Sequence, residues 1–406
     1  MDSPAIMELG NISLLILMLI ALALAWYSGF KTQFKSKSHF QKKQDKDYFI
    51  GLNYLLNDEP DLSIDAFISA LEINSSTLES HLALGTLLRR RGKVDGSIAV
   101  YQKLLANSQL NRHELDQVKL GLIKSYVAAG LLDRAEKLID ELKVAGPEIQ
   151  FSALNQGLTV YQLEKEWLKA TIIVNDLLKI CAPNQRSVYQ IKASHFYCEL
   201  SENELEFQHY NQARDYLNKA IGMDRNNVRT SLILGRLEFE QGNYKQAIKA
   251  LLKISSQDAG FRSQAFDLLI AAYQALNNKK DLQRYIDSCL QEPLSPSFLL
   301  MLIKHIEESE GREKAREIFF QQIKLNPSIE LLGQAILLNE GYSESNNHMQ
   351  NAEFFNHILE DYLAGKAKYR CDNCGFELRS LHWLCPGCNE WGTVKPHSFL
   401  LDDVKI

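Results

Sequence analysis

The sequence contains little proline and no strong excess of charge of either sign. Only nine prolines occur in 406 residues, and the alternation of apolar and polar residues that marks a half-buried β-strand is hard to find. Leu, Ile, Ala, Tyr and Phe instead recur three and four residues apart, which is the helical period. The net charge of −5 does not favour a nucleic-acid-binding protein, because such proteins are usually basic. We therefore expect a mainly helical protein with no nucleic-acid partner.

Charged residues are missing from a segment near the N-terminus, between Leu9 and Phe30. About twenty apolar residues are needed to cross a bilayer, so this segment is long enough. Trp26 and Tyr27 stand at its end, where amphipathic rings favour the membrane interface. Six lysines follow between residues 31 and 46, whereas the only charged residues before the segment are the acidic Asp2 and Glu8. Because positive charge stays on the cytoplasmic side, we expect a single-pass protein with most of the chain in the cytoplasm.

A cleaved signal peptide is the alternative interpretation of this segment. The small residues Ala21, Ala23 and Ala25 favour it, but a signal peptide needs a basic stretch before its apolar run. The stretch here is acidic, which favours an uncleaved anchor over residues 1–30. The Lys-rich residues 31–47 are then expected to form a juxtamembrane linker close to anionic lipid.

An internal repeat follows the linker. Gly51 lies 34 residues before Gly85, and Phe67 lies 34 residues before Tyr101. This is the period of the tetratricopeptide repeat, in which each unit is a pair of antiparallel helices. We expect eight units from Tyr48 to about Pro327 and a degenerate ninth from 328 to 363. An ordinary helical bundle is the alternative, but it would not repeat the same register along the chain.

The second helix of each unit shows a small residue followed four positions later by a bulky one. A small residue lets two helices approach closely, and the bulky one fills the adjoining groove. The pairs are Ala135 with Ile139, Ala170 with Val174, Ala213 with Leu217, Ala247 with Leu251, and Ala315 with Phe319. Gly92, Gly130 and Gly242 lie between helices, where we expect left-handed C-caps. The spacing lengthens near residues 202–209 and 343–350, which predicts longer helices or loops there.

The repeats carry no convincing catalytic cluster. His195, Cys198 and Glu202 lie in one predicted helix and are residue types used in nucleophilic catalysis. Their neighbours are apolar and aromatic, however, and a cysteine and a histidine in one sequence form no dyad without the right geometry. We therefore expect these residues to be structural. Solenoids of this class bind peptides or whole proteins, so a non-enzymatic binding function is predicted.

Four of the seven cysteines fall within eighteen residues near the C-terminus. They form two CxxC pairs separated by ten residues, which is a strong signal for a metal site. Two turns whose sulfurs converge would give a tetrahedral four-sulfur site, with Gly375 in a left-handed conformation and Pro386 stiffening the second turn. The predicted ligands are Cys371, Cys374, Cys385 and Cys388. Aromatic and apolar residues nearby are expected to pack around the metal as a small core, namely Tyr369, Phe376, Leu381, Trp383 and Trp391.

Two disulfides are the alternative for these cysteines, but a cytoplasmic location disfavours them. An all-thiolate tetrahedral site suits zinc and iron equally, so the sequence leaves the metal's identity open. A single iron centre would permit electron transfer, yet no flavin or nicotinamide fingerprint accompanies it. A structural or docking role is therefore favoured. The remaining cysteines, Cys181, Cys198 and Cys289, are isolated and expected to be buried apolar residues.

The order of these parts resembles the lipopolysaccharide assembly protein B family. The likeness covers essentially the whole chain and is carried by DYFIGLNYLL from Asp47, ASHFYCEL from Ala193, YRCDNCGF from Tyr369 and LHWLCPGC from Leu381. The chain departs from the family at its start, where extra residues with an acidic lead-in precede the apolar segment.

The resemblance implies an adaptor of the inner membrane in Gram-negative bacteria. Such proteins bring the deacetylase that commits the cell to lipid A synthesis to a membrane-bound ATP-dependent zinc protease, and they work with other lipopolysaccharide assembly proteins. The family's rubredoxin-like ligands correspond to the four cysteines above, and that description favours iron while zinc stays chemically plausible. A membrane-anchored redox protein with a rubredoxin-like iron centre is the alternative function.

The expected architecture is therefore all-α with one small metal-binding domain. Residues 1–30 form the transmembrane anchor and residues 31–47 the linker. Residues 48–363 form a superhelical tetratricopeptide solenoid of eight or nine units, and residues 364–406 form the rubredoxin-like or zinc-ribbon domain.

Overall fold

A computed structural model describes residues 77–106, 110–325, 327–339, 357, 362 and 366–397. The chain divides into two compact units, Met1–Val160 and Tyr161–Ile406, which are described separately below. The predicted anchor, the linker and the first helix pair lie outside the described residues. Within those described ranges, none of the helices has both the length and the apolar character needed to cross a membrane.

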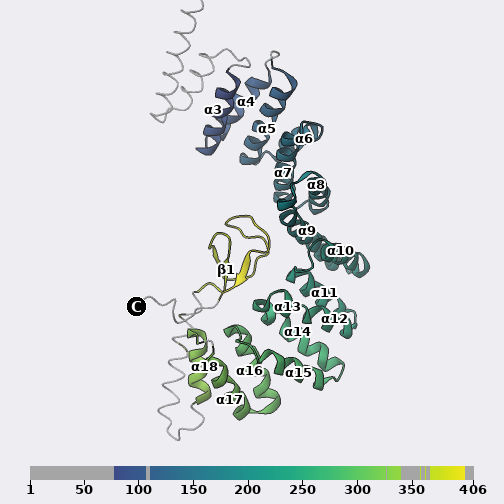
Figure 1. Cartoon of the computed structure of the whole chain (residues 1–406), viewed down its shortest axis with the longest axis vertical. Coiled ribbons are helices and arrows are strands. Elements are labelled where there is room, and N and C mark those ends of the chain that lie inside the picture. Colours follow the sequence, from purple (N-terminus) through teal and green to yellow (C-terminus); the bar gives the residue numbers. More distant parts are fainter. Residues whose placement is uncertain are drawn as a thin grey trace, which may run out of the picture. The chain divides into compact units, whose positions relative to one another are not determined.

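The first unit consists of helices that pack as successive hairpins (Figure 1). They are α3 (Leu78–Arg90), α4 (Val94–Leu105), α5 (Arg112–Ala128), α6 (Leu132–Leu142) and α7 (Pro147–Leu163), whose last turn passes into the second unit. Asn111 caps α5, since its side chain accepts a hydrogen bond from the backbone N–H of Glu114, and the Glu114 carboxylate accepts one from the N–H of Asn111. This reciprocal pair satisfies two backbone donors at the start of the helix.

The second unit continues the helix pairs and ends in a small three-stranded domain (Figure 1). Its helices are α8 (Trp167–Ile180), α9 (Arg186–Glu206), α10 (Tyr210–Met223), α11 (Val228–Glu240), α12 (Tyr244–Leu252), α13 (Ile254–Gln257), α14 (Arg262–Ala275), α15 (Lys279–Cys289), α16 (Pro296–Glu310), α17 (Arg312–Ile323) and α18 (Ile329–Asn339), with short 3₁₀ turns η1 (Pro183–Gln185) and η2 (Ala259–Phe261). The longer spacing predicted near residue 202 corresponds to α9, which has 21 residues. The second stretch, 343–350, lies outside the described residues.

The turns between paired helices use left-handed residues. Gly92, Gly130 and Gly242 have φ angles of +79°, +72° and +75°, as predicted for helix C-caps. Other turns place Lys165, Gln208 and Asn277 in the same conformation, with φ of 58°, 60° and 52°. This conformation is sterically unfavourable for a residue that has a Cβ atom. The packing of the helices on both sides of the turn holds these three residues in it.

Close helix packing follows the predicted pairs of small and bulky residues. All ten residues of those pairs are at most 2% exposed. Glycines on the facing helices allow an even closer approach: a Cβ at Gly235 would lie 2.5 Å from Leu251, and one at Gly121 would collide with the ring of Tyr101. The fully buried Tyr101 is therefore wedged between Gly121 and Gly85. The contacts of Gly85 and Gly235 lie within a helix pair, and that of Gly121 joins α4 to the next pair.

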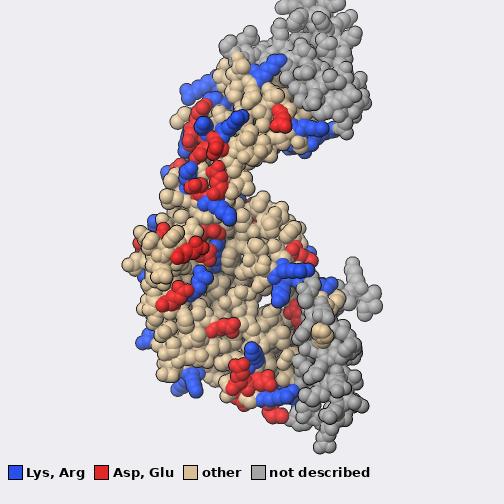
Figure 2. Space-filling model, turned by 180° about the vertical axis from the view of Figure 1, so that it is seen from behind, with Lys and Arg blue, Asp and Glu red and all other residues tan. Residues whose placement is uncertain are grey.

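Charged side chains of both signs are mixed on one face of the molecule. On the described part of the face seen in Figure 2, basic and acidic residues are interspersed and neither sign forms a continuous stripe. This pattern matches the near-balanced totals of 45 Lys and Arg against 50 Asp and Glu.

The glycine contacts give a direct test of the repeat packing. Gly121→Ala should lower the free energy of unfolding by about 1–3 kcal/mol, because the added methyl group collides with a buried ring in a packed core. Gly222→Ala in α10 is the matched control, since nothing lies within 4 Å of the added Cβ. Chemical denaturation followed by helical circular dichroism measures both. Equal stability of the two variants would contradict the proposed packing around Tyr101.

Candidate metal centre

The C-terminal domain has very little regular secondary structure. Its strands are β1 (Tyr369–Cys371), β2 (Glu377–Leu378) and β3 (Val394–Pro396), paired antiparallel in the order β2-β1-β3. Strands of two or three residues contribute few ladder hydrogen bonds. The shape of the domain therefore depends on the two cysteine-bearing turns between them.

The two turns share one hydrogen-bonding pattern. The Cys371 N–H donates to the carbonyl of Phe376, and the Cys385 N–H donates to that of Glu390. The N–H groups of Gly375 and Asn389 close the turns by donating to the carbonyls of Cys371 and Cys385, each at 2.8 Å. Gly375 and Asn389 have φ of 74° and 55°. The left-handed Gly375 is thus confirmed, whereas Asn389, its counterpart fourteen residues later, was not anticipated.

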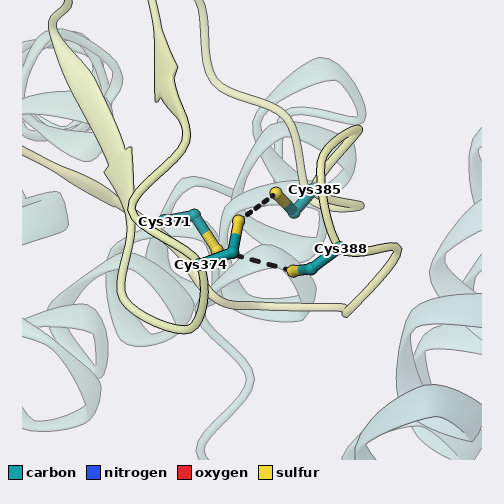
Figure 3. Close-up of side chains that lie close together, drawn as sticks. All are labelled: Cys371, Cys374, Cys385 and Cys388. Carbon is teal, nitrogen blue, oxygen red and sulfur yellow. Dashed lines mark hydrogen bonds between the residues drawn. The ribbon is translucent and has the colours of Figure 1, made fainter.

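These turns bring the four predicted ligands together (Figure 3). The Sγ atoms all lie within 4.8 Å of one another, and the pairs Cys371–Cys388 and Cys374–Cys385 are each 3.7 Å apart. A tetrahedron with metal–sulfur distances of about 2.3 Å has sulfur–sulfur edges of about 3.8 Å. A disulfide would need about 2.05 Å. The arrangement therefore fits one metal ion in a four-cysteine site and does not identify the metal.

Hydrogen bonds prepare part of the site for negative charge. Burial alone would raise the pKa of Cys371, but the Thr393 hydroxyl, 3.3 Å from its Sγ, and backbone N–H groups lower this pKa to about 6. The Asn373 side chain likewise lowers the pKa of Cys388. A backbone N–H favours the thiolate of Cys374 as well, yet its pKa is raised to about 12 by partial desolvation and its three thiol neighbours. Four thiolates cannot share this space unless a cation offsets their repulsion.

The aromatic residues of this domain do not pack as predicted. The small core around the site consists of Cys371, Leu378, Cys385 and Val394, with Tyr369 and Leu381 at its edge. Phe376 is 46% exposed, and Trp383 and Trp391 point to the repeat helices instead of surrounding the site. The prediction of an aromatic core around the metal was therefore wrong for three of its five members.

Trp391 is the centre of the contact with the repeats. It is 4% exposed and stacks on His195 of α9 at a ring-centroid distance of 5.1 Å. Its ring also makes T-shaped contacts with Phe196 of α9 and Trp167 of α8, at ring-centroid distances of 5.7 and 6.0 Å. The Arg229 guanidinium of α11 lies 5.9 Å from its ring centroid. Aromatic pairs of this geometry contribute about 0.5–1.5 kcal/mol each beyond the area they bury.

A second aromatic contact and polar contacts surround the first. Trp383 stacks on Phe261 of η2 at 5.5 Å. Lys395 pairs with Asp258 at 2.7 Å, and Glu390 pairs with Lys192 of α9 at 3.3 Å. The Gln264 side chain of α14 donates to the Tyr369 hydroxyl at 3.0 Å. The domain is thus fixed to α8, α9, α11, η2 and α14.

His195, Cys198 and Glu202, which were considered as a nucleophilic group, each make a separate structural contact. Cys198 is fully buried, lies 3.2 Å from the Thr230 hydroxyl, and has its pKa raised by burial to about 12. Glu202 pairs with Arg229, and His195 stacks against Trp391. His195 is therefore a docking residue, which the sequence did not reveal because Trp391 lies almost two hundred residues away. Cys289 is buried as expected, but Cys181 is only partly buried.

The buried His195 predicts a pH dependence of stability. Burial, followed by the nearby charges of Arg229 and Lys395, holds the pKa of His195 well below its usual value. His195 is therefore neutral when docked but takes up a proton below about pH 6.5 when exposed. The stability that this pKa shift supplies is present above pH 6.5 and is lost as the pH falls below it.

Replacing His195 by Phe should reduce this loss. Between pH 6.5 and 5.5, the wild-type protein should lose about 1 kcal/mol more unfolding free energy than His195→Phe. Denaturation at both pH values measures the difference in unfolding free energy. Protonation of the cysteines affects both proteins equally, so it does not contribute to the difference between them. Parallel pH profiles for the two proteins would contradict the placement of His195.

The chain matches known families in both its repeats and its metal-binding domain. Residues 369–396 match the rubredoxin metal binding domain family, and residues 50–112 and 204–278 match tetratricopeptide repeat families. A solved tetratricopeptide repeat protein from Parabacteroides merdae is 15% identical, with a TM-score of 0.33 over 65% of this chain and 99% of its own.

Two curated relatives match along nearly their whole length. Lipopolysaccharide assembly protein B of Escherichia coli strain K12 is 30% identical over 383 residues, covering 94% of this chain and 97% of that protein. The Haemophilus influenzae protein of the same name is 31% identical over 396 residues, covering 95% and 98%. With this identity and coverage, the chain belongs to the lipopolysaccharide assembly protein B family.

Proposed function

We propose that this chain is a non-enzymatic adaptor of the bacterial inner membrane that regulates lipopolysaccharide synthesis. In this role it presents the lipid A-committing deacetylase to a membrane-bound ATP-dependent protease. Membership of the lipopolysaccharide assembly protein B family over 94% of the chain is the observation that carries the proposal. The tetratricopeptide repeats support it, because such repeats form surfaces that bind proteins.

We further propose that Cys371, Cys374, Cys385 and Cys388 are the ligands of one zinc or iron ion. The ion would cross-link two turns whose strands are too short to hold the domain together. Its contribution is then folding free energy and not catalysis. The folded domain in turn presents Trp383 and Trp391 to the repeats.

Residues 9–30 would keep the adaptor in the membrane with the repeats on the cytoplasmic side. Confining the adaptor, the protease and the client to one surface raises their effective concentration without any new chemistry. The low net charge of −5 suits specific protein contacts better than binding to a polyanion.

Removing two ligands tests the metal assignment. The double variant Cys371→Ser, Cys385→Ser should lose stoichiometric metal and become sensitive to proteolysis after Lys368, because both turns lose their cross-link. Metal analysis and limited proteolysis measure these effects. Cys181→Ser is the control, since this cysteine is isolated and partly buried. One ion per chain retained by the double variant would refute the four-thiolate site.

Depletion in cells tests the adaptor function. Loss of the chain should lengthen the half-life of the lipid A deacetylase and raise lipopolysaccharide. Deleting residues 1–30 should have nearly the same effect with repeats and metal domain intact, because client and protease no longer share a surface with the adaptor. Pulse-chase measurement of the deacetylase gives the half-life.

The protease's activity on an unrelated substrate serves as the control and should not change. A general activator would change it, whereas an adaptor acts only on its client. An unaltered deacetylase half-life in cells that lack the chain entirely would end the adaptor proposal. Reversible one-electron reduction of the purified protein would instead favour the redox alternative.

A further inference from the structure

The metal-binding loops also carry the docking surface. Trp383 lies two residues before Cys385, and Glu390 and Trp391 lie two and three residues after Cys388. Their positions are set by the same turns that place the sulfurs. Any change that opens these turns must therefore also displace the side chains that contact α8, α9 and η2.

Among its described residues, the domain has little internal packing to hold this shape. Two of the four residues in its core, Cys371 and Cys385, are themselves candidate ligands, and its strands comprise at most three residues. A core this small is far below what an independent domain needs without a metal or disulfide. The docking surface is consequently intact only when the turns are cross-linked.

The docked interface is also less favourable than its aromatic contacts suggest. Three of its side chains have buried polar atoms without a hydrogen-bond partner among the described protein atoms: Trp391 Nε1, His195 Nδ1, and Nε and Nη1 of Arg229. Each buried group that lacks a partner costs roughly 1–3 kcal/mol. Water can reach the atoms at the interface once the domain moves away, so these groups oppose docking and offset part of the aromatic contacts.

We propose that metal binding and docking are thermodynamically linked, so that the docked state holds the metal more tightly and metal loss releases the domain from α8, α9 and η2. Release uncovers the sides of Trp167, Phe196 and Phe261 that Trp391 and Trp383 contact in the docked state. Linkage is reciprocal, so the factor by which metal favours docking is the factor by which docking strengthens metal binding. This linkage goes beyond the adaptor function and does not depend on it.

Variants on the repeat side test the linkage without touching the metal domain. Asp258→Asn removes the ion pair with Lys395, while the Asn carbonyl still accepts the hydrogen bond that Gly260 N–H donates to Asp258. His195→Ala removes the stacking on Trp391. In the full-length protein loaded with zinc and held in detergent, the double variant should transfer zinc to a colorimetric chelator about tenfold faster than wild type.

A matched control separates this effect from a general loss of charge pairs. Lys119→Gln removes the 2.6 Å pair with Glu141 in the first unit and should leave the zinc transfer rate unchanged. Circular dichroism checks that the repeats stay helical. If the double variant loses helicity, Asp258→Asn alone provides the comparison, with a smaller increase expected. Wild-type transfer rates in a helical variant would overturn the linkage.

Metal removal tests the opposite direction. Three of the four tryptophans, Trp167, Trp383 and Trp391, meet at this interface. Chelation should shift their emission to longer wavelength and speed amide exchange in α9, with helical circular dichroism preserved, and zinc should reverse both changes. Unchanged emission and exchange after complete zinc removal would overturn the proposal, because the domain would then stay docked without its metal.

Discussion

The described repeats pack in a row, so each buries apolar surface against the repeats next to it, and much of the described structure follows from that constraint. The small residues at Ala170, Ala213 and Ala247 are fully buried because successive helix pairs must approach closely at these points. Stacking along one direction, however, leaves the flanks of the array uncovered. Apolar and aromatic side chains on α8, α9 and η2 therefore need a separate cover, and the C-terminal domain supplies it.

That cover and the repeats depend on each other for physical reasons. The metal domain builds only a four-residue core of its own, and Trp383 and Trp391 pack against the helices instead of around the metal. The repeats gain a cover for Phe196 and Phe261, both at most 1% exposed. Two ion pairs at the rim, Lys192–Glu390 and Lys395–Asp258, are partly exposed. Such pairs add little stability, so their main effect is to orient the domain on the helices.

Much of this arrangement could be predicted from local sequence patterns, because both main signals are local. The spacing of the CxxC pairs defines two turns, and the alanine positions define where helices touch. The packing of Trp391 against the repeats could not be predicted, since its partners His195 and Arg229 are distant in the sequence. The left-handed residues Lys165, Gln208 and Asn277 were missed for a different reason: packing on both sides imposes a conformation that these side chains do not favour by themselves.

The docked domain also determines what kind of contacts the same region can still offer. With the aromatic face covered, an open pocket of about 400 Å³ is lined by Glu202, Leu205, Glu206, Arg236 and Glu240. Its lining is mostly charged, and contacts through exposed charges are individually weak and sensitive to salt. A protein that binds through such a surface gains little affinity from any single contact. Under the proposed function, confinement of both partners to one membrane would supply the concentration that such weak contacts do not, so the proposed anchor would contribute to the apparent affinity as well as to location.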